Sequence, residues 1–354
     1  MRSVFITGSA GFIGSYAVRE FINRGWFVFA LVHKKTSDEI IRFEKTGKLG
    51  IIKGSITDCD AVRESLELEI RRRNQKLHVI VHCAGRASDT GWRSEFRKTN
   101  YEAVKNSVCL AEYFKVERFV FISTTDVYGM KDFHGESEDR ILPENNTGNY
   151  YPEFKILSEK WITEKLPEHQ YSIIRPAQVW GIGDRTLTPR IVDFLGFSPF
   201  ILHFGKWKGK NRWPLAHVKN VASSVYLAAT SPEAAGQAFT VADDESTSID
   251  DFYRIIAEIY LPHKKHRTVS LPFWTGLLVG SIVSLISTAL NLKRPFADPS
   301  LYALYSVSRN LDFSNRKIRS LFISGNMKFI ALEEGIAEIR ADRQEDGLRE
   351  TMQS

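Results

Sequence analysis

The sequence predicts an α/β fold in which a doubly wound parallel sheet carries a smaller, mainly helical C-terminal lobe. Two observations support this prediction. Apolar runs alternate with helical patterns through the first half of the chain, as strands and crossover helices do in a parallel sheet. The runs at 79–81 and 119–122 are wholly apolar, which is typical of strands that are buried on both faces.

The expected elements follow the spacing of β-α units. Strands are predicted near residues 3–6, 27–32, 50–53, 78–83, 118–123 and 171–174, and helices near 12–24, 58–73, 93–115 and 151–166. Residues 129–150 are polar and contain Gly, Pro and Asn. We therefore expect a long loop there, of the kind that often carries function.

A glycine-rich turn follows the first strand. Glycine permits positive φ and the close approach of a ligand to the backbone, and the start of a helix attracts a pyrophosphate. The pattern therefore predicts a Rossmann-type dinucleotide site, and a plain tight turn is the alternative. The residues expected to form the site are Gly8, Gly11, Phe12, Ile13 and Gly14.

The second strand ends without an acidic residue to bind the ribose of NAD. In its place His33, Lys34 and Lys35 offer positive charge, which favours the 2′-phosphate of NADP. We therefore predict NADP(H) first and NAD(H) as a close second, with a solvated turn as the alternative interpretation. Further cofactor contacts are expected at Ser55, Ile56, Ala84 and Pro176.

At 354 residues the chain is longer than one typical domain, and 43% of its residues are apolar, enough for a substantial core. We expect residues 1–184 to form the dinucleotide-binding domain, to which 213–243 return. The substrate-binding lobe would comprise 185–212 and 244–340, and 341–354 would be a charged, frayed tail.

Charge and cysteine content narrow the classes of partner and compartment. The formal net charge of +6 is mild, and no aromatic or glycine pattern accompanies the basic run at 71–73, so we predict no nucleic-acid partner. Cys59, Cys83 and Cys109 fit neither a metal motif nor a disulfide framework. We predict no metal site and a reducing compartment. The first strand begins at residue 2 or 3 and leaves no room for a signal peptide, which indicates a cytoplasmic protein.

Tyr151 and Lys155 stand four residues apart, which places them on one face of a helix. A phenol is a poor base at neutral pH, and a nearby ammonium lowers its pKa. Tyr151 would then exchange a proton with an alcohol or ketone. Pro152 fits only a first helical turn, so Tyr151 should lie at the start of that helix. The hydroxyl groups at 123–125 end the fifth strand and should face the ligand.

Together these motifs resemble those of the extended short-chain dehydrogenase/reductase family, of the NAD-dependent epimerase/dehydratase type. The similarity covers residues 1–245, with matching segments at 7–14, 99–102, 123–129, 151–155, 175–184 and 217–222. The resemblance implies that Tyr151 is the acid/base and that Lys155 holds the nicotinamide ribose and lowers the pKa of the tyrosine. It also implies that Thr124 hydrogen-bonds the reacting oxygen and that Asn100 supports Lys155 through a water.

Within that family, residues 181–190 and the lipophilic C-terminal lobe look most like the 3β-hydroxysteroid dehydrogenase branch. That branch often prefers NAD, in conflict with the charges at 33–35. The sugar dehydratases carry T-D-E where this chain has Thr124, Thr125 and Asp126, which counts against dehydration.

The resemblance implies an NAD(P)-dependent oxidoreductase that transfers a hydride between nicotinamide and a secondary alcohol or ketone, including lipophilic, sterol-like ones. Two alternatives stay open. One is a nucleotide-sugar epimerase with tightly bound NAD, in which Arg190 and Arg212 contact a diphosphate. The other is a non-catalytic redox sensor, which the Tyr/Lys pair disfavours. The family commonly pairs through helices like those at 93–115 and 151–166, so we expect a homodimer.

Residues 268–292 contain no Asp, Glu, Lys or Arg, and basic clusters flank them at 263–267 and 293–294. Three interpretations stay open: a helix packed on the substrate cleft, a surface anchor whose apolar side chains enter lipid, and a membrane-spanning helix. Pro272, Gly276 and Gly280 dilute the segment and make the last the least favoured. Peripheral membrane association is therefore the second prediction for location.

Overall fold

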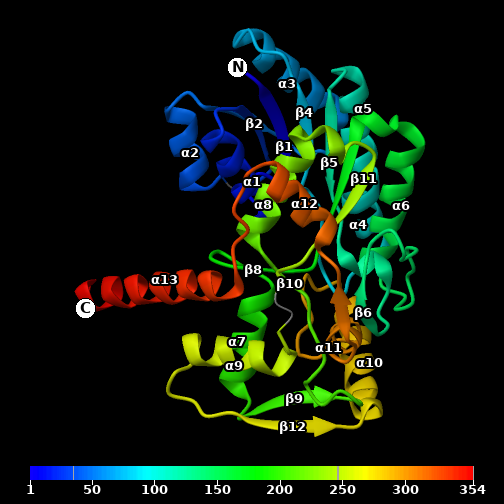
Figure 1. The fold of residues 1–354 in the computed structure, drawn as a ribbon, viewed down its shortest axis with the longest axis vertical. Coiled ribbons are helices and arrows are strands. Elements are labelled where there is room, and N and C mark those ends of the chain that lie inside the picture. The colour runs from blue at the N-terminus through cyan, green and yellow to red at the C-terminus, as the bar shows by residue number, and fades with distance from the viewer. Residues whose placement is uncertain (35, 245–246, 354) are drawn as a thin grey trace.

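The computed structural model describes residues 1–34, 36–244 and 247–353, of which 346–353 as backbone alone. Its centre is a parallel sheet in the strand order β11-β7-β5-β4-β1-β2-β3 (Figure 1). This is the doubly wound, Rossmann-type sheet that the sequence predicts, and its strand order reverses between β1 and β4, where such sheets bind ligands. The strands are β1 Ser3–Thr7, β2 Phe27–Val32, β3 Leu49–Lys53, β4 Val79–His82, β5 Arg118–Ile122, β7 Tyr171–Pro176 and β11 Gln237–Val241.

Alternating side chains of the strands build one apolar layer on each face of the sheet. Val4 and Ile6 pack toward α1 (Phe12–Asn23) and α8 (Val218–Thr230). Phe5, between them in sequence, packs on the opposite face. The helices of that face are α3 (Cys59–Arg72), α5 (Ala103–Tyr113) and α6 (Tyr150–Lys165). The expected strands and helices are thus confirmed, with bounds that shift by a few residues.

The remaining chain builds a second group of helices below the sheet (Figure 1). Its own apolar core gathers large aromatic side chains such as Trp180, Trp213 and Phe252. Its helices are α7 (Leu187–Phe197), α9 (Ile249–Tyr260), α10 (Phe273–Ala289) and α11 (Leu301–Val307). Three short parallel pairs join them: β8 (Gln178–Trp180) with β10 (Leu215–His217), β9 (Phe200–Phe204) with β12 (Arg267–Leu271), and β6 (Phe133–Glu136) with β13 (Leu311–Phe313).

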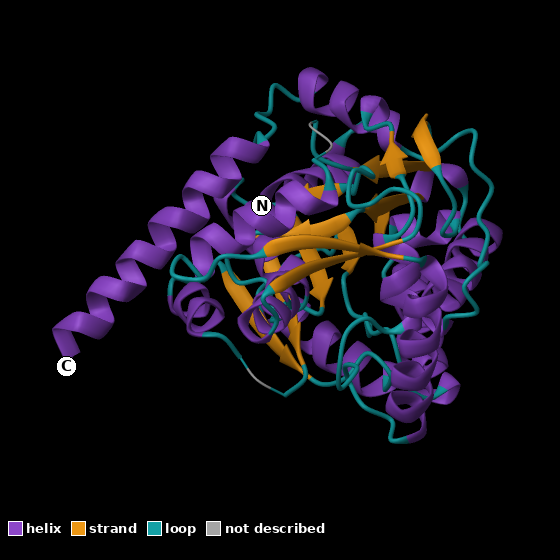
Figure 2. Cartoon of the chain, turned by 90° about the horizontal axis from the view of Figure 1, so that it is seen from below, coloured by secondary structure: helices purple, strands orange, loops and turns teal. Residues whose placement is uncertain are grey.

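Some expectations are wrong. The predicted loop at 129–150 contains β6. Its partner strand β13 is remote in sequence, so no local pattern predicts β6. A helix not predicted, α2 (Asp38–Lys45), follows β2. The tail expected to be frayed is helical instead: α13 (Leu332–Gln353) runs outward from the body in both views (Figure 1, Figure 2). α12 (Arg316–Ser324), which lies in the segment assigned to the substrate-binding lobe, packs on α8 and β11 of the sheet. The division into domains stays a prediction.

The apolar segment 268–292 forms β12 and then α10. α10 packs on α11, and its buried residues are Gly276, Gly280, Val283 and Ser287. Within the described ranges, we find no helix with the length and apolar character needed to cross a membrane.

Candidate active site

The glycine turn forms a tight cradle between β1 and α1. Gly8 has a φ of +67°, and a Cβ there would lie 2.8 Å from the backbone nitrogen of Ala84. A Cβ on Gly14 would collide with the carbonyl of Gly8. Gly11 is the N-cap residue of α1 and brings no capping side chain, so the N–H groups of the first turn, which includes Phe12 and Ile13, are available to a ligand. The turn therefore has the bare backbone that a pyrophosphate requires.

The other predicted cofactor residues lie at the carboxyl ends of the same parallel strands. Exposed His33 and Lys34 follow β2, and Lys35 lies outside the described residues. Ser55 and Ile56 follow β3, Pro176 ends β7, and Ala84 follows β4, where its N–H donates to Thr7 Oγ1 at 3.1 Å. The fold thus brings every described member of this set to one edge of the sheet.

Lys155 reaches the end of β5 from α6. Its Nζ donates to the carbonyl oxygen of Ile122 at 2.6 Å, and the residue is only 5% exposed. Burial disfavours the charged ammonium and lowers the pKa of Lys155 to about 8. The site therefore contains an amine that titrates much closer to neutral pH than an ordinary lysine.

Tyr151 lies in the first turn of α6, as Pro152 predicts. The side-chain oxygen of Asn149 caps the helix and accepts the Tyr151 N–H at 2.7 Å. The hydroxyl of Thr124, buried just after β5, hydrogen-bonds the phenol of Tyr151. Lys155 Nζ lies 5.9 Å from the centre of the Tyr151 ring. The structure therefore gathers Thr124, Tyr151 and Lys155 at one strand end.

The expected effect of Lys155 on Tyr151 is wrong in this structure. Burial raises the pKa of the Tyr151 phenol and the carboxylate of Asp126 raises it further, while the hydrogen bond from Thr124 lowers it. Lys155 instead directs its Nζ at the Ile122 carbonyl. The Tyr151 phenol therefore stays protonated at neutral pH, as a proton donor must.

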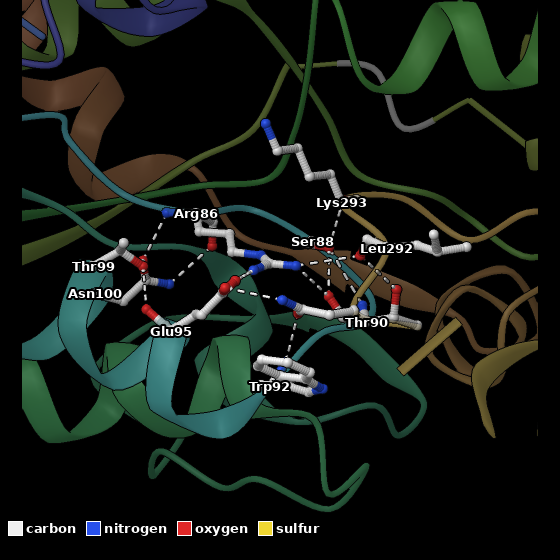
Figure 3. Close-up of polar contacts among 10 residues, drawn as sticks. Arg86, Ser88, Thr90, Trp92, Glu95, Thr99, Asn100, Leu292 and Lys293 are labelled. Atoms are coloured by element: carbon white, nitrogen blue, oxygen red, sulfur yellow. Dashed lines mark hydrogen bonds and ion pairs between the residues drawn. The ribbon is translucent and has the colours of Figure 1, made fainter. Parts of the chain in front are cut away.

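Asn100 lies beside Lys155, in a π-helical segment at Arg97–Glu102. Its Oδ1 accepts the backbone N–H of Arg86 at 2.6 Å, and its Nδ2 donates to the carbonyl of Arg86 at 2.8 Å (Figure 3). A Cβ on Gly85 would lie 3.4 Å from Asn100 Oδ1 and 3.8 Å from Lys155 Nζ, so both groups approach the same point. Asn100 thus fixes the loop that follows β4 next to Lys155.

Two residues of the site were missed as functional candidates, Asp126 and Tyr302. Tyr302 on α11 donates its hydroxyl to Asp126 Oδ2 at 2.5 Å. Burial raises the pKa of the Asp126 carboxyl, although the hydrogen bonds from Tyr302 and Thr124 each lower it. The sequence could have predicted a role for Asp126, because it directly follows the hydroxyl residues at the end of the fifth strand. No sequence pattern near Tyr302 predicts that it belongs to the site.

The two arginines proposed for a diphosphate are already paired. Arg190 donates through Nη1 to Asp89 at 3.1 Å and forms an ion pair with Asp298. Arg212 is exposed and lies 3.5 Å from Asp312. The guanidinium of Arg190 thus neutralises two carboxylates of the protein itself.

The strand order and the glycine cradle place the protein in the class of Rossmann-type dinucleotide-binding proteins. The model of the NAD dependent epimerase/dehydratase family matches residues 4–242, more than half of the chain, and the protein belongs to that family. It is an enzyme of this NAD-dependent group, whose members include dehydrogenases, reductases, epimerases and dehydratases.

Similar proteins share most of their length with this chain. A sterol-4-alpha-carboxylate 3-dehydrogenase (decarboxylating) of Dictyostelium discoideum is 26% identical over 90% of this chain and 94% of its own. A 2-alkyl-3-oxoalkanoate reductase of Shewanella oneidensis is 22% identical over 95% of this chain and 85% of its own. The crystal structure of UDP-glucuronic acid 4-epimerase from Bacillus cereus, in complex with UDP-glucuronic acid and NAD, has a TM-score of 0.69 at 18% identity. The similarity covers 97% of this chain and 99% of the epimerase chain. This last similarity concerns the fold.

We predict that the wild-type protein gains stability relative to a Lys155→Met variant as the pH rises from about 8 toward 10.5. In this window the folded lysine has lost its proton while the unfolded one still binds it, so stability rises with pH by up to about 1.4 kcal/mol per unit. Urea unfolding of both proteins across this range measures the difference. Parallel curves would show that Lys155 keeps an ordinary pKa in the fold.

Proposed function

We propose that the protein is an NAD(P)-dependent oxidoreductase that converts a secondary alcohol and the corresponding ketone into one another. The observation that carries this proposal is the cluster of Tyr151, Thr124 and Lys155 at the end of β5, next to the strand ends where the cofactor residues gather. A bound nicotinamide dinucleotide, held by the glycine cradle and Lys155, would supply or accept the hydride.

The residues of the chain perform the proton chemistry. In ketone reduction, Tyr151 Oη gives its proton to the carbonyl oxygen as this becomes an alcohol. Thr124 Oγ1 positions the phenol, and its hydrogen bond, which lowers the pKa of Tyr151, favours the phenolate that is left. In alcohol oxidation the same phenolate takes the proton back. Because the pKa of Tyr151 is raised, the resting phenol is protonated at neutral pH, which is the form that gives a proton to a ketone.

A lipophilic substrate suits the site better than a nucleotide sugar does. Two of the similar proteins are named for a sterol carboxylate and a 2-alkyl-3-oxoalkanoate, which have extended carbon skeletons. Near Tyr151 the protein offers Asp126, and Arg190 is engaged with Asp89 and Asp298, an arrangement that repels a diphosphate. We also propose that residues 268–292 bring the protein to a membrane surface, where such substrates concentrate.

Replacing Tyr151 with Phe should lower kcat/KM by about 10²- to 10⁴-fold, because the substrate oxygen loses its proton donor. The matched control is Tyr150→Phe, since Tyr150 has Phe154 rather than a lysine four residues on. NADPH and NADH oxidation with a panel of lipophilic ketones measures activity, and fluorescence titration measures cofactor binding, which both variants should keep. Full activity in Tyr151→Phe, or its loss in the control alone, would contradict the assignment.

We propose NADP(H) as the preferred cofactor, because the exposed cations His33 and Lys34 follow β2 and fit a 2′-phosphate. The description of the family as NAD dependent favours the alternative, NAD(H).

The Lys34→Ala variant tests this preference. We expect its affinity for NADPH to fall by about fivefold, the effect of one exposed ionic contact, with the affinity for NADH unchanged. Lys160→Ala removes another exposed lysine, on α6, and should leave both affinities as they are. Tighter binding of NADH than of NADPH by the wild-type protein would overturn the proposal.

We further propose that two copies pair through the helical segment at 93–113 and through α6. Five residues line a hollow on the outer side of α6 and the π-helical segment, and the half-exposed Leu157 lies among them; the others are Arg93, Arg97, Tyr101 and Phe154. An apolar side chain between cations and aromatic rings is typical of the centre of a protein interface.

The mass in solution tests the pairing. Light scattering should give the mass of two chains for the wild type and of one chain for Leu157→Arg, because the new charge would be buried in the interface without a partner. Leu142→Arg, at an exposed position of the loop before α6, should stay paired. A single-chain wild type would exclude the dimer.

A further inference from the structure

Helix α10 has its apolar pattern turned outward. Its buried positions carry small side chains: a Cβ on Gly276 would lie 2.5 Å from Leu304 Cδ1, and one on Gly280 would lie 3.1 Å from the Leu301 nitrogen. These glycines are therefore needed for the close packing of α10 on α11. Most of the large apolar side chains of α10 stand on the other face, whereas Phe273, at the start of the helix, packs on Tyr305 of α11.

The outward face is a continuous stripe. Trp274, Leu278, Ile282 and Leu285 recur at helical spacing and are 66%, 62%, 52% and 73% exposed. Val279 and Ile286 flank the stripe, and Leu290 extends it past the end of the helix. Isolated exposed apolar residues are normal on a protein surface, but a patch of this size marks a contact surface. We call the residues of α10 named in this paragraph, with Leu290, the α10 stripe.

The charged side chains near the α10 stripe in sequence are all cations. Residues 259–297 contain five Lys and Arg residues and no Asp or Glu. All five cations are exposed: Lys264, Lys265, Arg267, Lys293 and Arg294. Arg294 has an exposed ion pair with Asp193 at 3.4 Å, a kind of contact that contributes little and exchanges readily. An apolar stripe between cations matches the headgroup region of an anionic bilayer.

The geometry points to one occupant: we infer that α10 lies flat on an anionic membrane surface, with the stripe in the acyl boundary and the flanking cations at lipid phosphates. A second copy of the chain fits less well, since a two-fold interface brings the same patch to both sides and would offer these cations no acidic partner. The β9–β12 pair and α10 occupy the end of the molecule away from the seven-stranded sheet, so this docking leaves the sheet clear of the bilayer (Figure 1).

The membrane-facing helix ends directly beside the candidate active site. Just after α10, Asn291 Nδ2 donates to Glu95 at 2.9 Å, and its Oδ1 accepts the Trp92 N–H at 3.1 Å. Arg86 donates to the carbonyl of Leu292 at 3.2 Å, while its backbone holds Asn100 (Figure 3). If the proposed oxidoreductase function holds, docking through α10 would keep the active site close to the bilayer that contains a lipophilic substrate.

Flotation of the full-length protein with vesicles tests the docking. The probes are phosphatidylcholine vesicles with and without phosphatidylglycerol. We expect the wild type to float with the phosphatidylglycerol vesicles and to be released by high salt. Leu278→Asp/Leu285→Asp should weaken binding at least about tenfold, because two leucines no longer enter the acyl boundary. Lys265→Glu/Lys293→Glu should weaken binding about tenfold for phosphatidylglycerol vesicles alone.

The matched control is Leu68→Asp/Ile323→Asp, which changes residues of similar exposure, 68% and 76%, far from α10 in sequence. It should float as the wild type does, with thermal unfolding confirming that all variants fold. Tyr151→Phe, though inactive, should also float normally, which separates failure of docking from failure of the proposed function. A wild type that floats with neither vesicle, equal flotation of Leu278→Asp/Leu285→Asp, or a dimer that this variant alone splits would overturn the inference.

Discussion

The ammonium of Lys155 is buried at the carboxyl end of β5, where it contacts the carbonyl of Ile122 and the face of the Phe121 ring, 4.6 Å away. A charge removed from water is costly unless fixed dipoles or aromatic faces replace its hydration. These two partners belong to the strand itself, so the ammonium ties α6 to the end of β5. Tyr151 lies one helical turn before Lys155 and is thereby brought to Thr124.

One turn further along α6, a second contact fixes the same helix to the neighbouring strand. Glu159 accepts two hydrogen bonds from Arg175 of β7, at 3.0 and 2.6 Å, with both side chains almost fully buried. Such a pair adds little net stability, but its forked geometry sets orientation. Arg175 also donates to Tyr128, which bonds Thr240 of β11. Three adjacent strands therefore hold the helix that carries Tyr151.

The sequence was informative where a local pattern has only one structural solution. Wholly apolar runs specify buried strands, a glycine such as Gly8 specifies a backbone that a side chain would obstruct, and Tyr151 with Lys155 specifies one helical face. The sequence predictions that were wrong or missing depend on contacts that the spacing of residues does not encode. The Asp126–Tyr302 contact joins residues 176 positions apart, and the direction of Lys155 Nζ follows from the nearest carbonyl. Burial, which no spacing reveals, sets the pKa of Tyr151.

The same reasoning connects α10 with the chemistry. Gly276 and Gly280 allow α10 to approach α11 closely, and the Leu301 N–H at the start of α11 donates to Ser284 Oγ of α10 at 2.8 Å. Tyr302 follows immediately and reaches Asp126, while Ser300 donates to Asp89 at 2.5 Å. The position of Tyr302 beside Asp126 and Tyr151 is therefore set by the packing of a helix whose opposite face is apolar and exposed. A partner that covers that face would therefore contact α10 directly. Through the packing of α10 on α11, it could shift the Tyr302 hydroxyl that donates to Asp126.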